Sequence, residues 1–402
     1  MKSIDSRDKN LISRNESKPT ISDCRIVVID DELSVCEQIK NTLESIGCSN
    51  VELFHDGANG LESVLENIPD LLIVDLHMPG MGGLEVLEKL RSQFVYDELP
   101  IIMETGRGTP DEIKKLLSIG ANNIIRKPID SDLLISRVCL HLENVMLLRG
   151  LRDYRNRLEQ ELKAARDMQE KLLPLAEDVA KAEGRFKIAI GAHYQPSTEL
   201  GGDLWGMQII DDNRIGFYLV DFSGHGVGAS INTFRLHTIL KQLSVTASPA
   251  QYLQILNSKV DNFIERGHYA TMVYALVDIE KNTLIYSIAG APPALVYYKG
   301  TDQLSVGSGS GMPLGIMRNM EYEDIEVSFP ADASLFLYSD AFYENQQING
   351  DAIGLQGVDD FVRNSINVNS NKLTLDSILD GFFKCQSDSI EDDLTLVVAS
   401  RA

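Results

Sequence analysis

The segment DLLIVDL (residues 70–76), followed by LEVLEKLRS (84–92), decides the fold of the first third of the chain. The first is a short apolar run of the kind found in strands buried on both faces, and the second has the apolar spacing of a helix. Four more strand–helix pairs of this kind lie between Cys24 and Leu142. Their succession predicts a doubly wound α/β fold with a parallel sheet.

The rest of the chain follows a different pattern. Beyond Gly184, alternating strand-like segments surround two helical stretches near 227–245 and 250–265, which predicts an α+β layered domain. Counting steps of three and four residues from Leu148 gives eight seam positions, of which six are apolar, and this predicts a helical linker with coiled-coil character, ended by Pro174. The eight positions are Leu148, Leu151, Arg155, Leu158, Leu162, Ala165, Gln169 and Leu172. A helix packed on its own domain is the open alternative. The expected segments are a flexible tail, an α/β domain, the linker and the layered domain, at residues 1–23, 24–146, 147–173 and 174–402.

Composition restricts the class of protein. The chain has 402 residues and a formal charge of −22, so a nucleic-acid or anionic-membrane partner would need a basic patch, and none is found. No apolar run is long enough to span a bilayer, and the polar start does not resemble a signal peptide, so we expect a cytoplasmic protein. The cysteines form no CxxC motif and are expected to be reduced; they are Cys24, Cys36, Cys48, Cys139 and Cys385.

Polar side chains follow several strands of the predicted parallel sheet. They are Asp30, Asp31, Asp75, Thr105 and Lys127, and the carboxyl ends of parallel strands meet at one edge. Three carboxylates at one place would repel one another unless a hard cation such as Mg²⁺ joined them. A carboxylate beside Mg²⁺ can act as a nucleophile toward phosphorus, while Lys127 and the Thr105 hydroxyl neutralise the acyl phosphate. Each residue alone is weak evidence, because Asp after a strand is more often a turn or cap residue.

Residues 24–146 resemble the receiver domain of two-component response regulators. The resemblance rests on VVIDDE (27–32), IVDLHMPGMGG (73–83), MET (103–105) and IIRKP (124–128). It implies that Asp75 accepts a phosphoryl group from a histidine kinase, with Mg²⁺ held near Asp30 and Asp31. Ile124 stands where the family usually has an aromatic switch residue, so the way in which the signal is relayed is open.

A second set of carboxylates stands out in the C-terminal part. They are Asp203, Asp221, Asp340 and the pair Asp392 and Asp393, mostly at the ends of apolar strands. Burial there would raise their pKa values unless cations compensated. Two divalent cations bridged by one carboxylate would do so, and would activate water for direct attack on a phosphoryl group. Read singly, each Asp is more often a turn residue.

Residues 166–402 resemble bacterial metal-dependent Ser/Thr phosphatases of the type 2C-like class that regulate sigma factors. The matching motifs keep the family order: ARDMQEKLLP (165–174), GGDLWG (201–206), DFSGHGVGAS (221–230), ATMVYALVD (270–278), AGAPPALV (289–296), MPLGI (312–316), LYSDAFYE (337–344) and DDLTLVV (392–398). The resemblance implies two Mn²⁺ or Mg²⁺ ions bridged by Asp221. It implies further ligands from the Phe222 carbonyl, Asp203, Asp340 and Asp392, with Asp393 as the alternative last ligand.

Three residues near these motifs need separate interpretation. We expect His225 to be structural rather than a proton donor, because metal-activated water needs no imidazole. Ala341 replaces a Gly that commonly follows the metal-binding Asp, and a left-handed conformation there would cost about 1–2 kcal/mol. Ala291 replaces the usual His of AGHPP. Neither replacement removes an expected metal ligand.

The favoured function is a response regulator in which phosphorylation of Asp75 controls a phosphoserine/phosphothreonine protein phosphatase. By family analogy, the substrate is a phosphorylated anti-sigma-factor antagonist, and the helical linker forms a homodimer. The alternative is an adaptor that binds a sigma factor when phosphorylated and has an idle phosphatase-like domain. A metal-dependent nuclease or cyclase fits the carboxylates but neither the charge nor the motif order.

Overall fold

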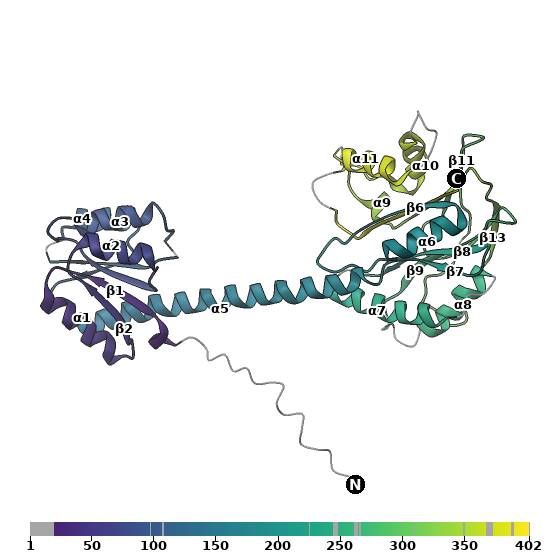
Figure 1. The fold of residues 1–402 in the computed structure, drawn as a ribbon. Coiled ribbons are helices and arrows are strands. Elements are labelled where there is room, and N and C mark those ends of the chain that lie inside the picture. Colours follow the sequence, from purple (N-terminus) through teal and green to yellow (C-terminus); the bar gives the residue numbers. More distant parts are fainter. Residues whose placement is uncertain are drawn as a thin grey trace, which may run out of the picture. The chain divides into compact units, whose positions relative to one another are not determined.

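A computed structural model shows two compact units, residues 1–158 and 159–402, each described here by itself (Figure 1). The predicted tail up to residue 19, and His225, lie outside the described residues. Within the described part, no helix is both long and apolar enough to cross a bilayer. The described residues are 20–96, 98–106, 108–224, 226–243, 248–260, 264, 267–309, 311–348, 350–366, 373–386 and 390–401.

The first unit contains a five-stranded parallel sheet with the order β2-β1-β3-β4-β5, as the α/β prediction requires. Every residue of β3 and β4 is buried, because helices cover both faces of the sheet. One face packs against α1 and α5 and the other against α2, α3 and α4. The strands are β1 (Arg25–Ile29), β2 (Asn50–Phe54), β3 (Leu71–Asp75), β4 (Ile101–Thr105) and β5 (Asn123–Arg126). The first four helices are α1 (Leu33–Ser45), α2 (Gly57–Glu66), α3 (Gly83–Arg91) and α4 (Pro110–Ile119), after a 3-10 turn at Ile21–Asp23.

The helix α5 (Ser131–Glu170) has 40 residues. Its start packs on the parallel sheet through Leu134, Val138 and Leu142, and its last turns belong to the second unit. The predicted linker is therefore part of one continuous helix, which ends at Glu170 rather than at residue 173. The coiled-coil character of this segment stays a prediction.

The predicted seam of α5 does not keep one environment along its length. Leu151 and Leu158 are exposed, 64% and 41%, whereas Gln169 is only 3% exposed. Leu172, just beyond the helix, packs against a hydrophobic cluster of the second unit. Leu151 and Leu158 are therefore open to a partner helix, whereas Gln169 and Leu172 make contacts within the second unit.

The second unit contains two antiparallel sheets of five strands each, and the predicted α+β layered class is confirmed. The first has the order β13-β10-β9-β8-β7, with β7 (Leu204–Ile209), β8 (Arg214–Phe222), β9 (Ala270–Asp278), β10 (Thr283–Ala289) and β13 (Ile325–Ser328). The other has the order β12-β11-β14-β15-β6, with β6 (Ile188–Gln195), β11 (Leu295–Tyr298), β12 (Gln303–Val306), β14 (Ala333–Tyr338) and β15 (Leu394–Arg401).

Three hydrophobic clusters show that the second unit has four layers. One cluster lies between the two sheets and contains Phe217, Val273 and Leu335 together with Trp205. A second joins the β8–β9 sheet to α7 (Val227–Gln242) and α8 (Pro249–Val260). A third joins the other sheet to α9 (Ala341–Glu344), α10 (Gly354–Ser365) and α11 (Leu375–Cys385). Helix α6 (Ala176–Phe186) adds Ala182 and Phe186 to the cluster between the sheets.

Candidate functional sites

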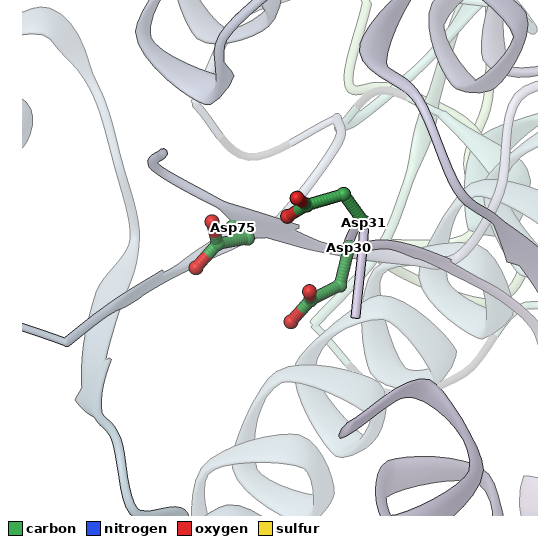
Figure 2. A group of neighbouring side chains, drawn as sticks. All are labelled: Asp30, Asp31 and Asp75. Carbon is green, nitrogen blue, oxygen red and sulfur yellow. The ribbon is translucent and has the colours of Figure 1, made fainter. Parts of the chain in front are cut away.

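The first acidic site lies at the carboxyl edge of the parallel sheet. Asp30 follows β1, Asp75 ends β3, and Asp31 is the exposed neighbour of Asp30 (Figure 2). One ligand atom from each of these carboxylates lies within 4.8 Å of the other two, which is the spacing that a single cation needs. Asp31 and Asp75 border a cavity of about 520 Å³ that is also lined by Glu32, His77, Gly106 and Lys127.

Lys127 lies between the two buried carboxylates of this site. Its ammonium nitrogen is 2.6 Å from Asp30 Oδ2 and 2.8 Å from Asp75 Oδ1. Burial lowers the pKa of Lys127, but the hydrogen bonds to Asp30 and Asp75 outweigh it and raise the pKa above its usual value. Burial raises the pKa of Asp30 despite its contact with Lys127. The ammonium is therefore a permanent positive charge beside the candidate nucleophile.

Thr105 reaches the same edge through the backbone. It ends β4, and the amide of Lys127 donates a 2.9 Å hydrogen bond to its carbonyl oxygen. The Thr105 side chain is fully buried, and its hydroxyl has no hydrogen-bond partner among the described residues. All five residues expected at this edge are therefore near one another, and the buried Thr105 hydroxyl has no partner among the described residues.

Sequence reasoning missed one charged residue of this region, Glu104. It lies beside Asp75 in the strand register, is fully buried, and neither of its carboxylate oxygens has a hydrogen-bond partner among the described residues. Burial, with the charges of Asp30 and Asp75, raises the pKa of Glu104 to about 8 although Lys127 opposes the shift. An acidic residue inside the apolar run IIMET was the signal that could have revealed it.

The second acidic site gathers carboxylates from both antiparallel sheets. Asp203 immediately precedes β7, and Asp221 lies in β8, where the strand register brings it opposite Asp203. Asp340 follows β14, and the pair Asp392 and Asp393 precedes β15. Since β14 and β15 are neighbours in the other sheet, their carboxylates meet those of the first sheet at one end of the layered unit.

The carboxylates of the second site raise one another's pKa values. Burial and the charge of Asp221 raise the pKa of Asp203 well above its usual value. Burial, then Asp340, Asp392 and Asp393, raise the pKa of Asp221 to about 8. Burial and Asp392 raise the pKa of Asp340 to about 6. Such mutual repulsion is what bound cations would relieve.

The donor set of this site fits divalent cations. Asp203 is 1% exposed, and its Oδ2 atom is buried without a hydrogen-bond partner in the described part of the chain. Phe222, the next residue after Asp221, directs its carbonyl oxygen toward Gly202, where a Cβ would come within 3.0 Å of that oxygen. The close approach of this carbonyl favours glycine at position 202, and hard carboxylate and carbonyl oxygens are the ligands that Mg²⁺ and Mn²⁺ prefer.

Asp393 differs from the other carboxylates of the second site. Its Oδ1 accepts hydrogen bonds from the backbone amide and the hydroxyl of Ser197, at 2.7 and 3.0 Å, and its Oδ2 accepts one from the Gly202 amide. Asp392 is exposed, and its Oδ1 accepts from the Asp393 amide at 2.8 Å. Asp393 therefore holds the loop that leads to Asp203, whereas Asp392 is exposed and its charge acts on Asp221 and Asp340.

The same loop is held from the other side by the last turns of α5. Arg166 donates to the carbonyl oxygens of Thr198 and Glu199 at 3.0 and 2.8 Å. The Gln169 amide donates to the Gly201 carbonyl at 2.6 Å and accepts from the Gly201 amide at 3.1 Å. Gln169 was predicted to be a seam position, but its buried amide is used to fix this loop two residues before Asp203.

The two departures from the resemblance have structural explanations. Ala341 begins α9 and is 2% exposed, and it is absent from the described residues with positive φ. Ala341 therefore does not adopt the left-handed conformation that was considered from the sequence, and it carries no strain of that kind. Ala291 packs against the hydrophobic cluster between the sheets. Gly290, just before it, does need a positive φ of 71°, and a Cβ there would collide with Pro313.

Comparison with known families assigns each unit separately. Residues 26–139 match the response regulator receiver domain, and residues 211–402 match stage II sporulation protein E (SpoIIE). Phosphoserine phosphatase RsbP of Bacillus subtilis (strain 168) is 32% identical over 190 residues, which are 45% of this chain and 45% of RsbP. Response regulator MprA of Mycobacterium avium (strain 104) is 39% identical over 114 residues, 28% of this chain and 49% of MprA. The chain thus spans about half the length of these curated relatives.

Among solved structures, the SiaA-PP2C domain of Pseudomonas aeruginosa is similar to this chain. The TM-score is 0.53 at 17% identity, and the match covers 62% of this chain and 98% of the SiaA domain. At this identity the likeness concerns the fold alone. It agrees with the two-sheet architecture described above.

Proposed function

We propose that this chain hydrolyses phosphoserine or phosphothreonine in a protein under the control of Asp75 phosphorylation. It is a response regulator in which a receiver domain precedes a PP2C-type domain of the SpoIIE family. The observation that carries the proposal is the convergence of carboxylates from both antiparallel sheets, whose pKa values are raised by burial and by one another. Carboxylates that repel one another without a positive partner are costly, so their clustering favours a cation site.

In the first site, Asp75 is the proposed nucleophile. Its oxygen would form a bond to the phosphorus of a donor such as a histidine kinase phosphohistidine, and the bond from phosphorus to the donor nitrogen would break. Lys127, 2.8 Å from Asp75, and the unpartnered Thr105 hydroxyl would neutralise the acyl phosphate. Asp30 and Asp31, with Asp75, would hold the Mg²⁺ that this transfer uses.

In the second site, Asp203, Asp221, Asp340 and Asp392, with the Phe222 carbonyl, would hold two Mn²⁺ or Mg²⁺ ions. Asp221 is the proposed bridging ligand, because the charges that raise its pKa come from the carboxylates of the opposite sheet. When bound, the cations would activate the attacking water and neutralise the phosphoryl group. Asp393 is proposed to position Asp203 through the loop at 197–202 rather than to act as a ligand, because its oxygens already accept three hydrogen bonds.

Helix α5 is the proposed route from the receiver to the second site. It starts on the parallel sheet, and its last turns hold the loop before Asp203 through Arg166 and Gln169. Gln169 also donates to the Thr233 hydroxyl in α7 at 3.1 Å. A rotation or shift of the end of α5 would therefore move Asp203 relative to the other carboxylates and change how well cations bind.

The partners proposed for the chain follow from the family resemblance and from α5. A histidine kinase would supply the phosphoryl group, and a phosphorylated anti-sigma-factor antagonist would be the substrate. A second copy of the chain would pair along the exposed apolar residues of α5, namely Leu147, Leu151, Tyr154 and Leu158. The adaptor alternative had Ala341 and Ala291 in its favour, and neither is strained nor removes a ligand in the described structure.

Substitution of Asp221 by Asn tests the proposed phosphatase. The amide keeps the size of the side chain but removes the charge that would hold both cations, so hydrolysis of a phosphoserine protein with Mn²⁺ should fall by about three orders of magnitude. Asp376→Asn, on the exposed first turn of α11, is the matched control and should hydrolyse as fast as the wild type. A wild type without Mn²⁺-dependent hydrolysis, with the receiver in either state, would favour the adaptor.

A further inference from the structure

A short segment of the second unit exposes apolar side chains although its backbone is firmly held. Met312, Ile316 and Met317 are 45%, 49% and 53% exposed, and Tyr269, beside the segment, is 38% exposed. We call Tyr269 with residues 312–317 the apolar ridge. Apolar side chains that share one short segment form a patch of the kind that marks interaction surfaces.

Buried polar groups fix the backbone of the apolar ridge. Asn257, 1% exposed, donates to the Met317 carbonyl at 2.9 Å and accepts from the Gly315 amide at 2.8 Å. The Tyr322 hydroxyl donates to the Met312 carbonyl at 3.1 Å. Leu314, fully buried between these points, exchanges two backbone hydrogen bonds with Ala270. The exposed side chains thus stand on a fixed backbone, which lowers the entropic cost of binding.

The strand register locates the apolar ridge near the second acidic site. Asp221 in β8 lies opposite Thr271 in β9, and on the other side of β9 Ala270 forms a bridge with Leu314. Two strand spacings of ~4.8 Å therefore separate Asp221 from the ridge, about 10 Å in all. Tyr269 connects the ridge directly to the segment after Asp221, because its carbonyl accepts a 2.9 Å hydrogen bond from the amide of Ser223, two residues after Asp221.

Charge indicates what kind of contact a substrate can make here. The chain has a formal charge of −22 and the second site is a cluster of carboxylates, so a phosphorylated protein is not attracted by net charge. Bound cations would attract the phosphoryl group alone, so affinity for the rest of such a protein must come largely from apolar burial near the site. Methionine side chains are flexible and polarisable, and they suit a surface that accepts an apolar segment.

We propose that the apolar ridge docks an apolar segment of the phosphorylated substrate protein, about three to four residues from the phosphoserine or phosphothreonine in an extended chain. This inference rests on the proposed phosphatase function, and it specifies which part of the substrate, besides the phosphoryl group, the protein binds. The other possible occupant, a second copy of this chain, predicts no preference among phosphopeptides.

Two fluorescein-labelled phosphoserine peptides test this proposal. They carry equal charge and differ only in having Leu or Ser about three and four residues from the phosphoserine. Their dissociation constants are measured by fluorescence anisotropy on the full chain in a chelator, where metal-dependent turnover is absent. Burying two leucine side chains should make the Leu peptide bind at least about tenfold more tightly to the wild type.

The variant Ile316→Ser with Met317→Ser should bind both peptides within about twofold of each other. The matched control is Ile209→Ser, because Ile209 is 43% exposed at the other end of β7 from Asp203 and should leave the tenfold preference intact. A wild type without preference, or a ridge variant that keeps it, would overturn the proposal. Hydrolysis of p-nitrophenyl phosphate with Mn²⁺ is measured separately on the wild type. Absence of hydrolysis would overturn the proposed phosphatase activity, while the preference between the two peptides still tests whether the apolar ridge binds an apolar segment.

Discussion

The two acidic sites differ in how the repulsion among their carboxylates is compensated. In the first, Lys127 forms ion pairs of 2.6 and 2.8 Å with Asp30 and Asp75. In the second, Asp203, Asp221 and Asp340 form no ion pair with Lys or Arg in the described part of the chain, and their pKa values are raised. The first site has a lysine ammonium paired with its buried carboxylates, whereas Asp203, Asp221 and Asp340 of the second have no such partner in the described part of the chain.

This difference fits the two proposed reactions. A site that must keep a phosphoryl group on a carboxylate benefits from a fixed ammonium that neutralises the product. A site that must hydrolyse its substrate benefits from cations that activate water, and a lysine among its carboxylates would displace them.

The largest expected effect is the loss of covalent phosphorylation in Asp75→Ala. Asp75 is the carboxylate that ends β3 with Lys127 beside it, so a small phosphodonor with Mg²⁺ should label the wild type and leave Asp75→Ala unlabelled. Asp221→Asn should be labelled like the wild type, because the second site lacks the fixed ammonium. Equal labelling of wild type and Asp75→Ala would end the assignment.

Glu104 is the exception within the first site, because its carboxylate is buried without a partner. The folded pKa of about 8 exceeds the ordinary 4.5, so the folded receiver keeps a proton that the unfolded chain releases. Stability should therefore fall as pH rises from about 4.5 to 8, by roughly 4 kcal/mol. Glu104→Gln should remove most of this loss, as measured by urea unfolding of the full chain at several pH values.

Glu66→Gln, on the exposed end of α2, is the control for this experiment. It should keep the pH dependence of the wild type. If Glu104→Gln and the wild type lost the same stability between pH 5 and pH 8, Glu104 would not be a buried neutral acid at neutral pH.

Cations should stabilise the second unit more than the first. At a concentration of 100 times the dissociation constant, a bound ion adds about 3 kcal/mol to the free energy of unfolding. The effect should be larger at pH 8 than at pH 6, because Asp221, with a pKa of about 8, must lose its proton to bind. Calorimetry with and without Mn²⁺ measures this, and Asp221→Asn should reduce the shift. An equal shift in that variant would contradict the assignment of ligands.

The smallest expected effect concerns the exposed stripe of α5. Replacing Leu151 and Leu158 by Lys should weaken a homodimer by tenfold or more, about 1.4 kcal/mol, because like charges would meet in the seam. Light scattering measures the mass, and Asp153→Lys, on the same helix away from the stripe, is the control. A wild type that is monomeric in both phosphorylation states would rule out the coil.

The convergence of the first site's residues at one edge could be predicted from the sequence for a physical reason. Continuous apolar runs fix the strands of a parallel sheet, and the residue after each run then lies at one edge. Sequence spacing alone could not assign the roles in the second site, because Asp392 and Asp393 are adjacent. Only the hydrogen bonds that Asp393 accepts from Ser197 and Gly202 distinguish the two. Those partners lie about half the chain away in sequence, where no local pattern can indicate them.

Two errors have related causes. The three- and four-residue spacing placed Gln169 on a coiled-coil seam. Spacing alone cannot show that the Gln169 side chain forms hydrogen bonds with the carbonyl and amide of Gly201. Helices α10 and α11 were not predicted, although Thr374 caps α11 and their apolar residues fill the cluster on the outer face of the β14–β15 sheet. A capping residue followed by an apolar period was the missed signal.

Control of hydrolysis by the receiver can be measured in one rate comparison. Mn²⁺-dependent hydrolysis of a phosphoserine protein is measured with and without beryllium fluoride, which mimics the acyl phosphate. We expect the mimic to change the rate of the wild type by at least about tenfold, about 1.4 kcal/mol, but to leave Asp75→Ala unchanged. Gln169→Ala, still labelled at Asp75, should respond less than the wild type. The same rate for the wild type with and without the mimic would show that the receiver does not control hydrolysis.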